Sequence, residues 1–251
     1  MAFFRFGRSD NLYFPGCYTG KFAENSIENY KKILKKLDID FNLQKNFKCC
    51  GGFLDESGYE KDLRKLAREN SEEFKSKEYK KIITNCPLCC ITLNNYKNII
   101  PGWTINVEHI ILTILNKLRE NNEFMKNIFS EQVAYYDSCY LARYMNLVNE
   151  PREVLKKLGY NIFEFKKNKE ETLCCGSCGG LIHTNPDLSN KIASNFIKML
   201  KRSGIKKIIT SDPRDFVHLS KNLLKLGIGE DEIQVIEFSE AVCMGLNIKT
   251  N

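Results

Sequence analysis

The chain repeats itself, and this repeat restricts its fold more than any other feature of the sequence. Residues 80–89 return as residues 206–215, with six of the ten residues identical. Three further pairs of segments recur in the same order: Cys17-Tyr18 with Cys139-Tyr140, residues 33–37 with 154–158, and Cys49-Cys50-Gly51 with Cys174-Cys175-Gly176. We therefore expect two tandem homologous half-domains, residues 1–125 and residues 126–251.

Helical and strand-like segments alternate along both halves. Apolar residues three and four positions apart predict amphipathic helices, and short β-branched runs predict buried strands. The expected helices are 26–37, 58–75, 107–118, 151–158 and 187–201, and the expected strands are Lys81–Thr84 and Val133–Tyr136. This alternation predicts an α/β architecture with mostly parallel sheets, whose carboxyl ends are the usual place for a ligand or metal site.

Eleven of the 251 residues are cysteine, and their setting decides how to interpret them. Residues 1–16 lack the apolar core of a signal peptide. No run of 18 apolar residues occurs, so we expect no membrane span. We therefore expect a cytoplasmic protein. In that reducing compartment, clustered cysteines bind metals or carry out redox chemistry more often than they form disulfides.

The net charge of +7 invites comparison with nucleic-acid-binding proteins. The lysines are spread along the whole chain in short pairs, such as Lys31-Lys32 and Lys80-Lys81. Such pairs at helical spacing are typical of solvated helix faces. We therefore expect no nucleic-acid partner.

Five cysteines of the first half come from three separated segments, each expected near a strand end or a helix start. They are Cys17, Cys49, Cys50, Cys86 and Cys89. Thiolates in this number favour zinc or an iron–sulfur centre over hard metals. Four thiols suffice for tetrahedral zinc, and two adjacent cysteines close poorly onto one ion. The fifth thiol and the adjacent pair therefore favour a larger multi-iron cluster.

This pattern resembles the cysteine-rich CCG domain, which occurs twice in the B-type and D-type subunits of archaeal heterodisulfide reductase. It is also similar to the same domain in thiol-fumarate reductase and in the iron–sulfur subunits of glycolate oxidase and anaerobic glycerol-3-phosphate dehydrogenase. The resemblance runs from about Tyr13 to about Ala241. It implies a noncubane 4Fe–4S cluster at the first site, with these ligands: Cys17, Cys49, Cys50, Cys86 and Cys89.

The second half departs from that pattern. It has Asp212 and Asp215 where the repeat requires cysteines, and carboxylates are poor substitutes for thiolates at an iron–sulfur cluster. It also gains a thiol at Cys178. The thiols that could still hold a cubane cluster or zinc, with either aspartate as an extra ligand, are Cys139, Cys174, Cys175 and Cys178. The alternative is a site without metal, where Asp212 caps the following helix.

Several other residues have weaker assignments. The family places a histidine where this chain has Tyr140. Of the three histidines, His183 and His218 could each donate a proton to a departing thiolate, whereas His109 is expected in the core on a helix face. Cys90 and Cys243 are expected to be small buried residues outside any site.

The resemblance implies an iron–sulfur redox subunit that passes electrons to a disulfide or a similar small-molecule thiol compound. The chain contains neither the CxxCxxCxxxC run of ferredoxins nor a GxGxxG nucleotide loop. Its electrons must therefore come from a ferredoxin-like or flavin-containing partner subunit. Two alternatives stay open: a non-catalytic electron-transfer or scaffold subunit of a flavin-dependent hydroxyacid dehydrogenase complex, and a zinc-binding interaction module.

Overall fold

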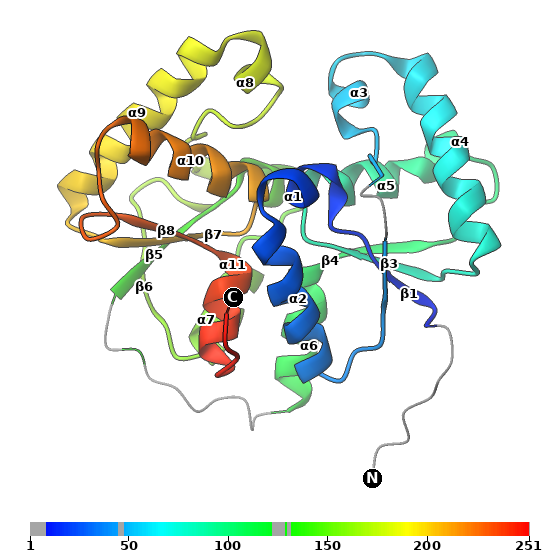
Figure 1. Cartoon of the computed structure of the whole chain (residues 1–251), viewed down its shortest axis with the longest axis horizontal. Coiled ribbons are helices and arrows are strands. Elements are labelled where there is room, and N and C mark those ends of the chain that lie inside the picture. The colour runs from blue at the N-terminus through cyan, green and yellow to red at the C-terminus, as the bar shows by residue number, and fades with distance from the viewer. Residues whose placement is uncertain (1–8, 45–47, 122–128, 130–131, 251) are drawn as a thin grey trace.

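The first half of the chain forms a four-stranded parallel sheet covered by helices (Figure 1). The computed structural model describes residues 9–44, 48–121, 129 and 132–250. The sheet has the order β2-β1-β3-β4. Its strands are β1 (Asn11–Tyr13), β2 (Asn42–Leu43), β3 (Lys81–Thr84) and β4 (Asn106–His109). The helices are α1 (Gly16–Phe22), α2 (Glu24–Lys36), α3 (Gly52–Glu56), α4 (Glu60–Ser76), α5 (Pro87–Ile99) and α6 (Ile110–Glu120).

The second half repeats this arrangement with a second four-stranded parallel sheet, in the order β6-β5-β7-β8. Its strands are β5 (Gln132–Tyr136), β6 (Asn161–Phe163), β7 (Lys207–Thr210) and β8 (Gln234–Glu237). Its helices are α7 (Glu150–Lys157), α8 (Leu181–Thr184), α9 (Pro186–Ser203), α10 (Pro213–Lys225) and α11 (Phe238–Gly245). A π-helical turn, η3 (Tyr140–Tyr144), and a 3₁₀ turn, η4 (Lys169–Glu171), complete the half.

The two sheets place corresponding strands in the same order, and every described strand pair is parallel. The predicted α/β class and the two tandem halves are thereby confirmed. The β-branched runs at 81–84 and 207–210 form β3 and β7, which lie in the middle of their sheets. The predicted boundary between residues 125 and 126 lies outside the described residues.

The predicted helix 107–118 is wrong in its first turn. Residues 106–109 form β4, and α6 begins only at Ile110. Val107 and His109 are buried on alternate positions, which is the period of a strand and not of a helix. His109 therefore lies at a strand end and not on a helix face. Its predicted burial is confirmed, and its ring accepts a hydrogen bond from the N–H of Ile111.

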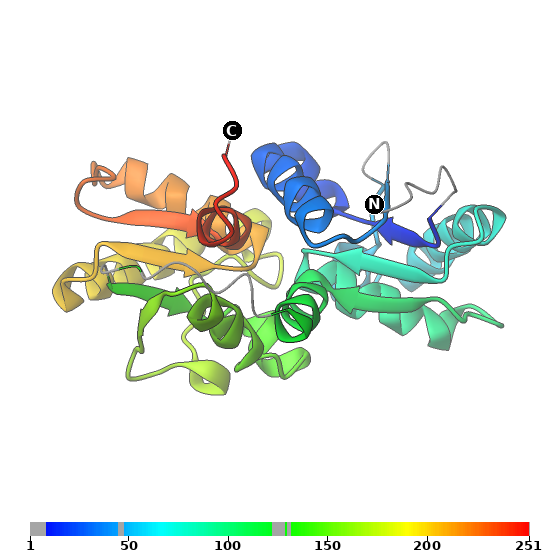
Figure 2. The ribbon, with the colours of Figure 1, turned by 90° about the horizontal axis from the view of Figure 1, so that it is seen from below.

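The two halves share one buried core. Helices α2 and α6 pack against α11 and α7, respectively, between the two sheets (Figures 1 and 2). A single apolar cluster crosses this contact, including Ile114 of the first half and Leu155 of the second. The Tyr30 hydroxyl donates a hydrogen bond of 3.1 Å to the Glu237 carboxylate across the same contact. Shared burial of this kind holds the carboxyl ends of the two sheets in a fixed relation.

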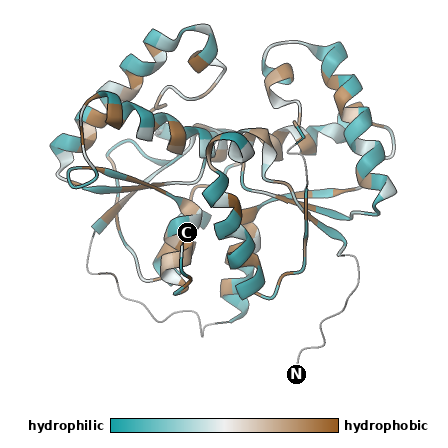
Figure 3. Ribbon diagram, in the orientation of Figure 1, coloured by the Kyte–Doolittle hydropathy of each residue, from teal (hydrophilic) through white to brown (hydrophobic). Residues whose placement is uncertain are grey.

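Two smaller cores lie on the other faces of the sheets, under α4 and α9. One includes Phe74 and Ile82, and the other includes Phe196 and Ile208. Hydrophilic and hydrophobic residues alternate along α4 and α9, as they do in helices with one buried face (Figure 3). Among the described residues, none of the helices combines the length and the apolar character needed to cross a bilayer.

Candidate metal centre

The five first-half cysteines lie at the carboxyl edge of the first sheet. Cys17 is in the first turn of α1, just after β1. Cys86 precedes α5 directly after β3, and Cys89 lies in the first turn of that helix. Cys49 and Cys50 precede α3. Because parallel strands end at one edge, segments far apart in the sequence bring their thiols together there.

All five thiols line one cavity of about 210 Å³. Cys50, Cys86 and Cys89 are buried, whereas Cys17 is exposed. The second half contributes the opposite wall, which includes Ser177, Gly180, Ile182, His183 and Arg214. The cavity therefore lies between the two halves, and its thiols come from the first half alone.

Glycines let the backbone approach these sulfurs. A Cβ on Gly16, whose φ is +80°, would lie 2.7 Å from Cys89 Sγ. The N–H of Gly51 donates to Cys49 Sγ at 3.3 Å, and the N–H of Gly52 donates to Cys50 Sγ at 3.4 Å. Amides directed at sulfur stabilise negative charge on it, which suits thiolate ligands.

Hydrogen bonds among the thiols decide which of them ionises most readily. Bonds from Cys17 and Cys50 lower the pKa of Cys49 to about 2. The same bonds, together with burial, raise the pKa of Cys17 and of Cys50. A hydrogen bond with Cys89 likewise lowers the pKa of Cys86, and bonds with Cys50 and Cys86 raise the pKa of Cys89. Thiols that ionise readily therefore lie beside thiols that hold their protons. Binding a metal here must release protons from the neighbours.

The spacing of the first-half thiols suits a group larger than one ion. Among the described residues, no three of these sulfurs all lie within 4.8 Å of one another. Sulfurs around tetrahedral zinc, with bonds of about 2.3 Å, would lie about 3.8 Å apart. The donor set is all thiol, and the cavity it lines is closed by protein on both sides. These residues fit an iron–sulfur cluster.

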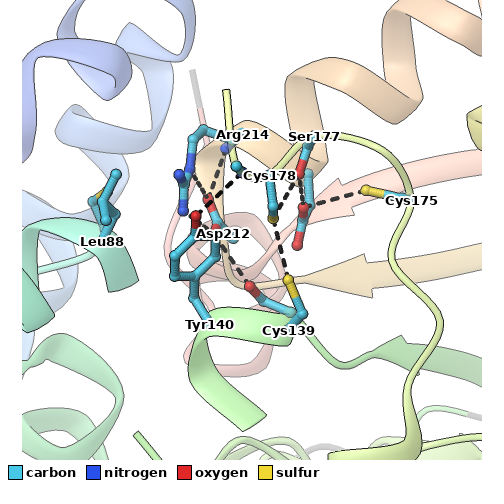
Figure 4. Close-up of polar contacts among 12 residues, drawn as sticks. Leu88, Cys139, Tyr140, Cys175, Ser177, Cys178, Asp212 and Arg214 are labelled. Carbon is cyan, nitrogen blue, oxygen red and sulfur yellow. Dashed lines mark hydrogen bonds and ion pairs between the residues drawn. The ribbon is translucent and has the colours of Figure 1, made fainter. Parts of the chain in front are cut away.

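The second half brings together three of its four predicted thiols. The sulfurs of Cys139, Cys174 and Cys178 all lie within 4.8 Å of one another. We call these residues the second-half trio. Cys139 Sγ is 3.2 Å from Cys178 Sγ, and the N–H of Gly176 donates to Cys174 Sγ at 3.3 Å. Cys175 is not part of this group: its buried thiol instead donates to Asp215 Oδ1 at 3.2 Å (Figure 4).

The two aspartates at the expected cysteine positions do not join the trio. Asp212 caps α10, where it accepts a hydrogen bond of 2.9 Å from the N–H of Arg214. Asp215 is buried and accepts hydrogen bonds from Ser177 and Cys175. Burial, with a smaller contribution from Asp212, raises the pKa of Asp215 to about 7. The capping role predicted for Asp212 is what the structure shows.

The two residues of the cavity wall that carry full charges, Arg214 and Glu56, were missed from the sequence. The guanidinium of Arg214 lies 4.3 Å from the centre of the Tyr140 ring and forms an ion pair with Asp212 (Figure 4). The Tyr140 hydroxyl donates a hydrogen bond to Glu56. A signal for Arg214 existed: in the repeat it occupies the position of Leu88, so a charge replaces an apolar side chain.

The remaining predicted residues separate into two groups. His183 lines the cavity, and its ring lies edge-on to Phe53 at 5.6 Å. His218 is buried in α10, where it contacts Ser189, and it does not line the first-half cavity. Cys90 and Cys243 are buried as predicted.

A family of known proteins matches both halves of the chain. The CCG cysteine-rich domain matches twice, at residues 11–94 and 133–220. The chain belongs to this family. It is 28% identical over 214 residues to an uncharacterized iron–sulfur protein of Methanocaldococcus jannaschii, covering 84% of this chain and 41% of the relative. It is also 28% identical over 198 residues to the D-type subunit of a heterodisulfide reductase of Methanosarcina mazei, covering 76% and 48%.

A third relative is the probable glycolate oxidase iron–sulfur subunit of Bacillus subtilis, which is 22% identical over 252 residues, covering 95% of this chain and 55% of that protein. The CCG chain thus spans about half the length of these curated relatives. Among solved structures, a glutamate racemase of Bacillus anthracis aligns with a TM-score of 0.40 at 11% identity, covering 94% of this chain and 79% of that one. The family is one of iron–sulfur oxidoreductase-type subunits.

Proposed function

We propose that this protein is an iron–sulfur redox subunit of the heterodisulfide reductase type. In this proposal it passes electrons to a disulfide or a similar small-molecule substrate. The observation that carries the proposal is the cavity at the carboxyl edge of the first sheet, lined by five thiols from three segments. A noncubane 4Fe–4S cluster, held by Cys17, Cys49, Cys50, Cys86 and Cys89, would exchange single electrons and offer iron to a thiolate.

The residues around the cavity support this role in separate ways. The amides of Gly51 and Gly52 donate to ligand sulfurs and so stabilise their negative charge. Cys50, Cys86 and Cys89 are buried at the inner end of the cavity, whereas exposed Cys17 marks the end open to solvent. A substrate sulfur would reach the cluster from that open end. Electrons would come from a ferredoxin-like or flavin-containing partner subunit.

The second-half trio supports a separate metal proposal. Three sulfurs within 4.8 Å of one another suit one tetrahedral ion better than the first-half thiols do. We propose that Cys139, Cys174 and Cys178 bind zinc. The fourth zinc ligand in this proposal is not a cysteine of this chain. In this proposal Cys175 serves as a hydrogen-bond donor to Asp215 and not as a ligand.

The test is anaerobic purification of the full chain, followed by iron, sulfide and zinc analysis and electron paramagnetic resonance before and after thiol is added. About four irons and a thiol-sensitive signal support the proposal. Cys86→Ser should lose the iron and the signal. Cys243→Ser is the matched control, because Cys243 is equally buried but lies in α11, outside the cavity.

The outcomes separate the three candidate roles of the chain. Zinc without sulfide would overturn both iron–sulfur roles and leave a zinc-binding interaction module. A cluster whose signal ignores every added thiol and disulfide would favour the non-catalytic electron-transfer subunit. A second set of about four irons, lost in Cys178→Ser, would contradict zinc at the second-half trio.

A further inference from the structure

The second half places a permanent cation in the wall of the first-half cavity. Arg214 is 8% exposed, and no other lysine or arginine is among the described residues that line this cavity. Its counterpart in the repeat, Leu88, lines the same cavity from the first half. Because the same turn forms with leucine, the backbone does not need a charge at position 214. The arginine therefore calls for a different explanation.

Two neighbours hold the guanidinium in one orientation. Asp212 Oδ2 accepts from Arg214 Nη2 at 3.0 Å, and Asp212 Oδ1 accepts from Nε at 3.3 Å. Asp212 is itself fixed by a 3.1 Å hydrogen bond from Ser138 Oγ. The guanidinium lies over the Tyr140 ring, which supports it on a second side (Figure 4). An arginine held this way keeps its geometry without a ligand, so binding costs little ordering entropy.

One edge of this arginine remains available. Asp212 occupies the edge formed by Nε and Nη2, and in the described part of the chain Nη1 has no hydrogen-bond partner. The nearby acid in the cavity wall, Glu56, is engaged by the Tyr140 hydroxyl. Burial raises the pKa of Glu56, and the charge of Arg214 opposes that rise in part. A nearly buried cationic donor in a cavity wall favours an anionic acceptor.

We propose that Arg214 is a specificity-determining residue that binds the acidic group of a small thiol or disulfide whose sulfur reaches the first-half cysteines. This inference rests on the proposed function, since the cluster on those cysteines is what binds the sulfur. The two contacts are separate: the cluster recognises sulfur, and Arg214 recognises charge. The substrate class is therefore thiols or disulfides that carry a carboxylate or another acidic group.

The test compares 3-mercaptopropionate with 2-mercaptoethanol, two small thiols that differ in charge. Each is titrated into the anaerobic, iron-loaded full chain, and the change in the cluster's paramagnetic resonance signal gives an apparent Kd. The wild type should bind the anionic thiol about tenfold more tightly or better, as expected for a charge-assisted hydrogen bond. Arg214→Leu, which copies Leu88, should lose this preference without changing the Kd of 2-mercaptoethanol.

Controls keep the result interpretable. Arg64→Leu removes an exposed arginine on α4 and should leave the preference intact. If Arg214→Leu does not retain iron, Arg214→Gln, which keeps a polar side chain beside Asp212, decides the question. Unchanged preference in an iron-loaded Arg214 variant would overturn the inference, and so would an equal weakening of both thiols. A wild type without iron and sulfide would instead overturn the proposed function itself.

Discussion

The stability of the shared core should depend on pH through one buried acid. Glu237 ends β8, is 2% exposed and lies where the two halves meet. It accepts hydrogen bonds from the Ser239 N–H at 2.8 Å and from the Tyr30 hydroxyl at 3.1 Å. Burial nevertheless dominates and raises the pKa of Glu237 from its ordinary value of 4.5 to about 7.

The sign of the effect follows from proton linkage. The folded chain binds this proton more tightly than the unfolded chain, so protonation of Glu237 stabilises the fold. That contribution is complete below about pH 4.5 and is lost as the pH rises through about 7. At about 1.4 kcal/mol per pKa unit, the displacement corresponds to about 3 kcal/mol in the free energy of unfolding.

The assay is urea unfolding of the wild type and Glu237→Gln under anaerobic conditions from pH 5 to pH 8.5. Glutamine cannot ionise, so the variant should gain about 2 to 3 kcal/mol on the wild type across this range. Its amide also loses a hydrogen bond, but that offset is the same at every pH. Glu230→Gln, at an exposed position, is the matched control. A difference between wild type and Glu237→Gln that stays constant with pH would refute the reasoning.

Three further perturbations test other parts of the structure. Arg152→Met should cost about 3 kcal/mol in urea unfolding, because it leaves Asp137 buried without its ion-pair partner, whereas exposed Arg119→Met should cost under about 1 kcal/mol. Gly176→Ala should lower the Tm by several degrees, because φ is +93° and the new Cβ would lie 2.5 Å from the Ser189 carbonyl oxygen. Cys178→Ser should lose zinc that Cys175→Ser retains, as measured by metal analysis after dialysis against a weak chelator.

Much of the fold could be predicted because its signals are local. The β-branched runs at 81–84 and 207–210 form central strands, and the repeat relates the two sheets strand by strand. The turn from strand to helix at His109 was missed for a physical reason. Residues 106–109 are too short to show a period of two clearly, and the apolar run that follows them belongs to a helix.

One part of the candidate site could also be predicted from local signals, and another part could not. The five first-half thiols were predicted to meet because each follows a strand or precedes a helix at one sheet edge, and all five line one cavity. The separation of Cys175 from the second-half trio could not be predicted. It depends on the orientation of one buried thiol toward Asp215, forty positions further along the chain. A sequence pattern reports which thiols are near one another, but not which way each one points.

The residues at which the second half differs from the family pattern contact one another, and these contacts change how the differences are interpreted. Considered singly, Asp212 and Asp215 look like losses of metal-binding cysteines, and Tyr140 looks like the loss of a histidine. In the structure Asp212 forms an ion pair with Arg214, and the Arg214 guanidinium lies over the Tyr140 ring. Asp215 accepts a hydrogen bond from the thiol of Cys175. A buried carboxylate is costly unless hydrogen bonds or an opposite charge compensate it. Each of these side chains has a polar or charged partner, although Asp215 Oδ2 is buried without a hydrogen bond. Arg214 presents the cation of this group to the thiols of the other half. The second half thus contributes a charge to the first-half site through Arg214, whose two aspartate neighbours occupy positions where the repeat would have supplied two further thiols.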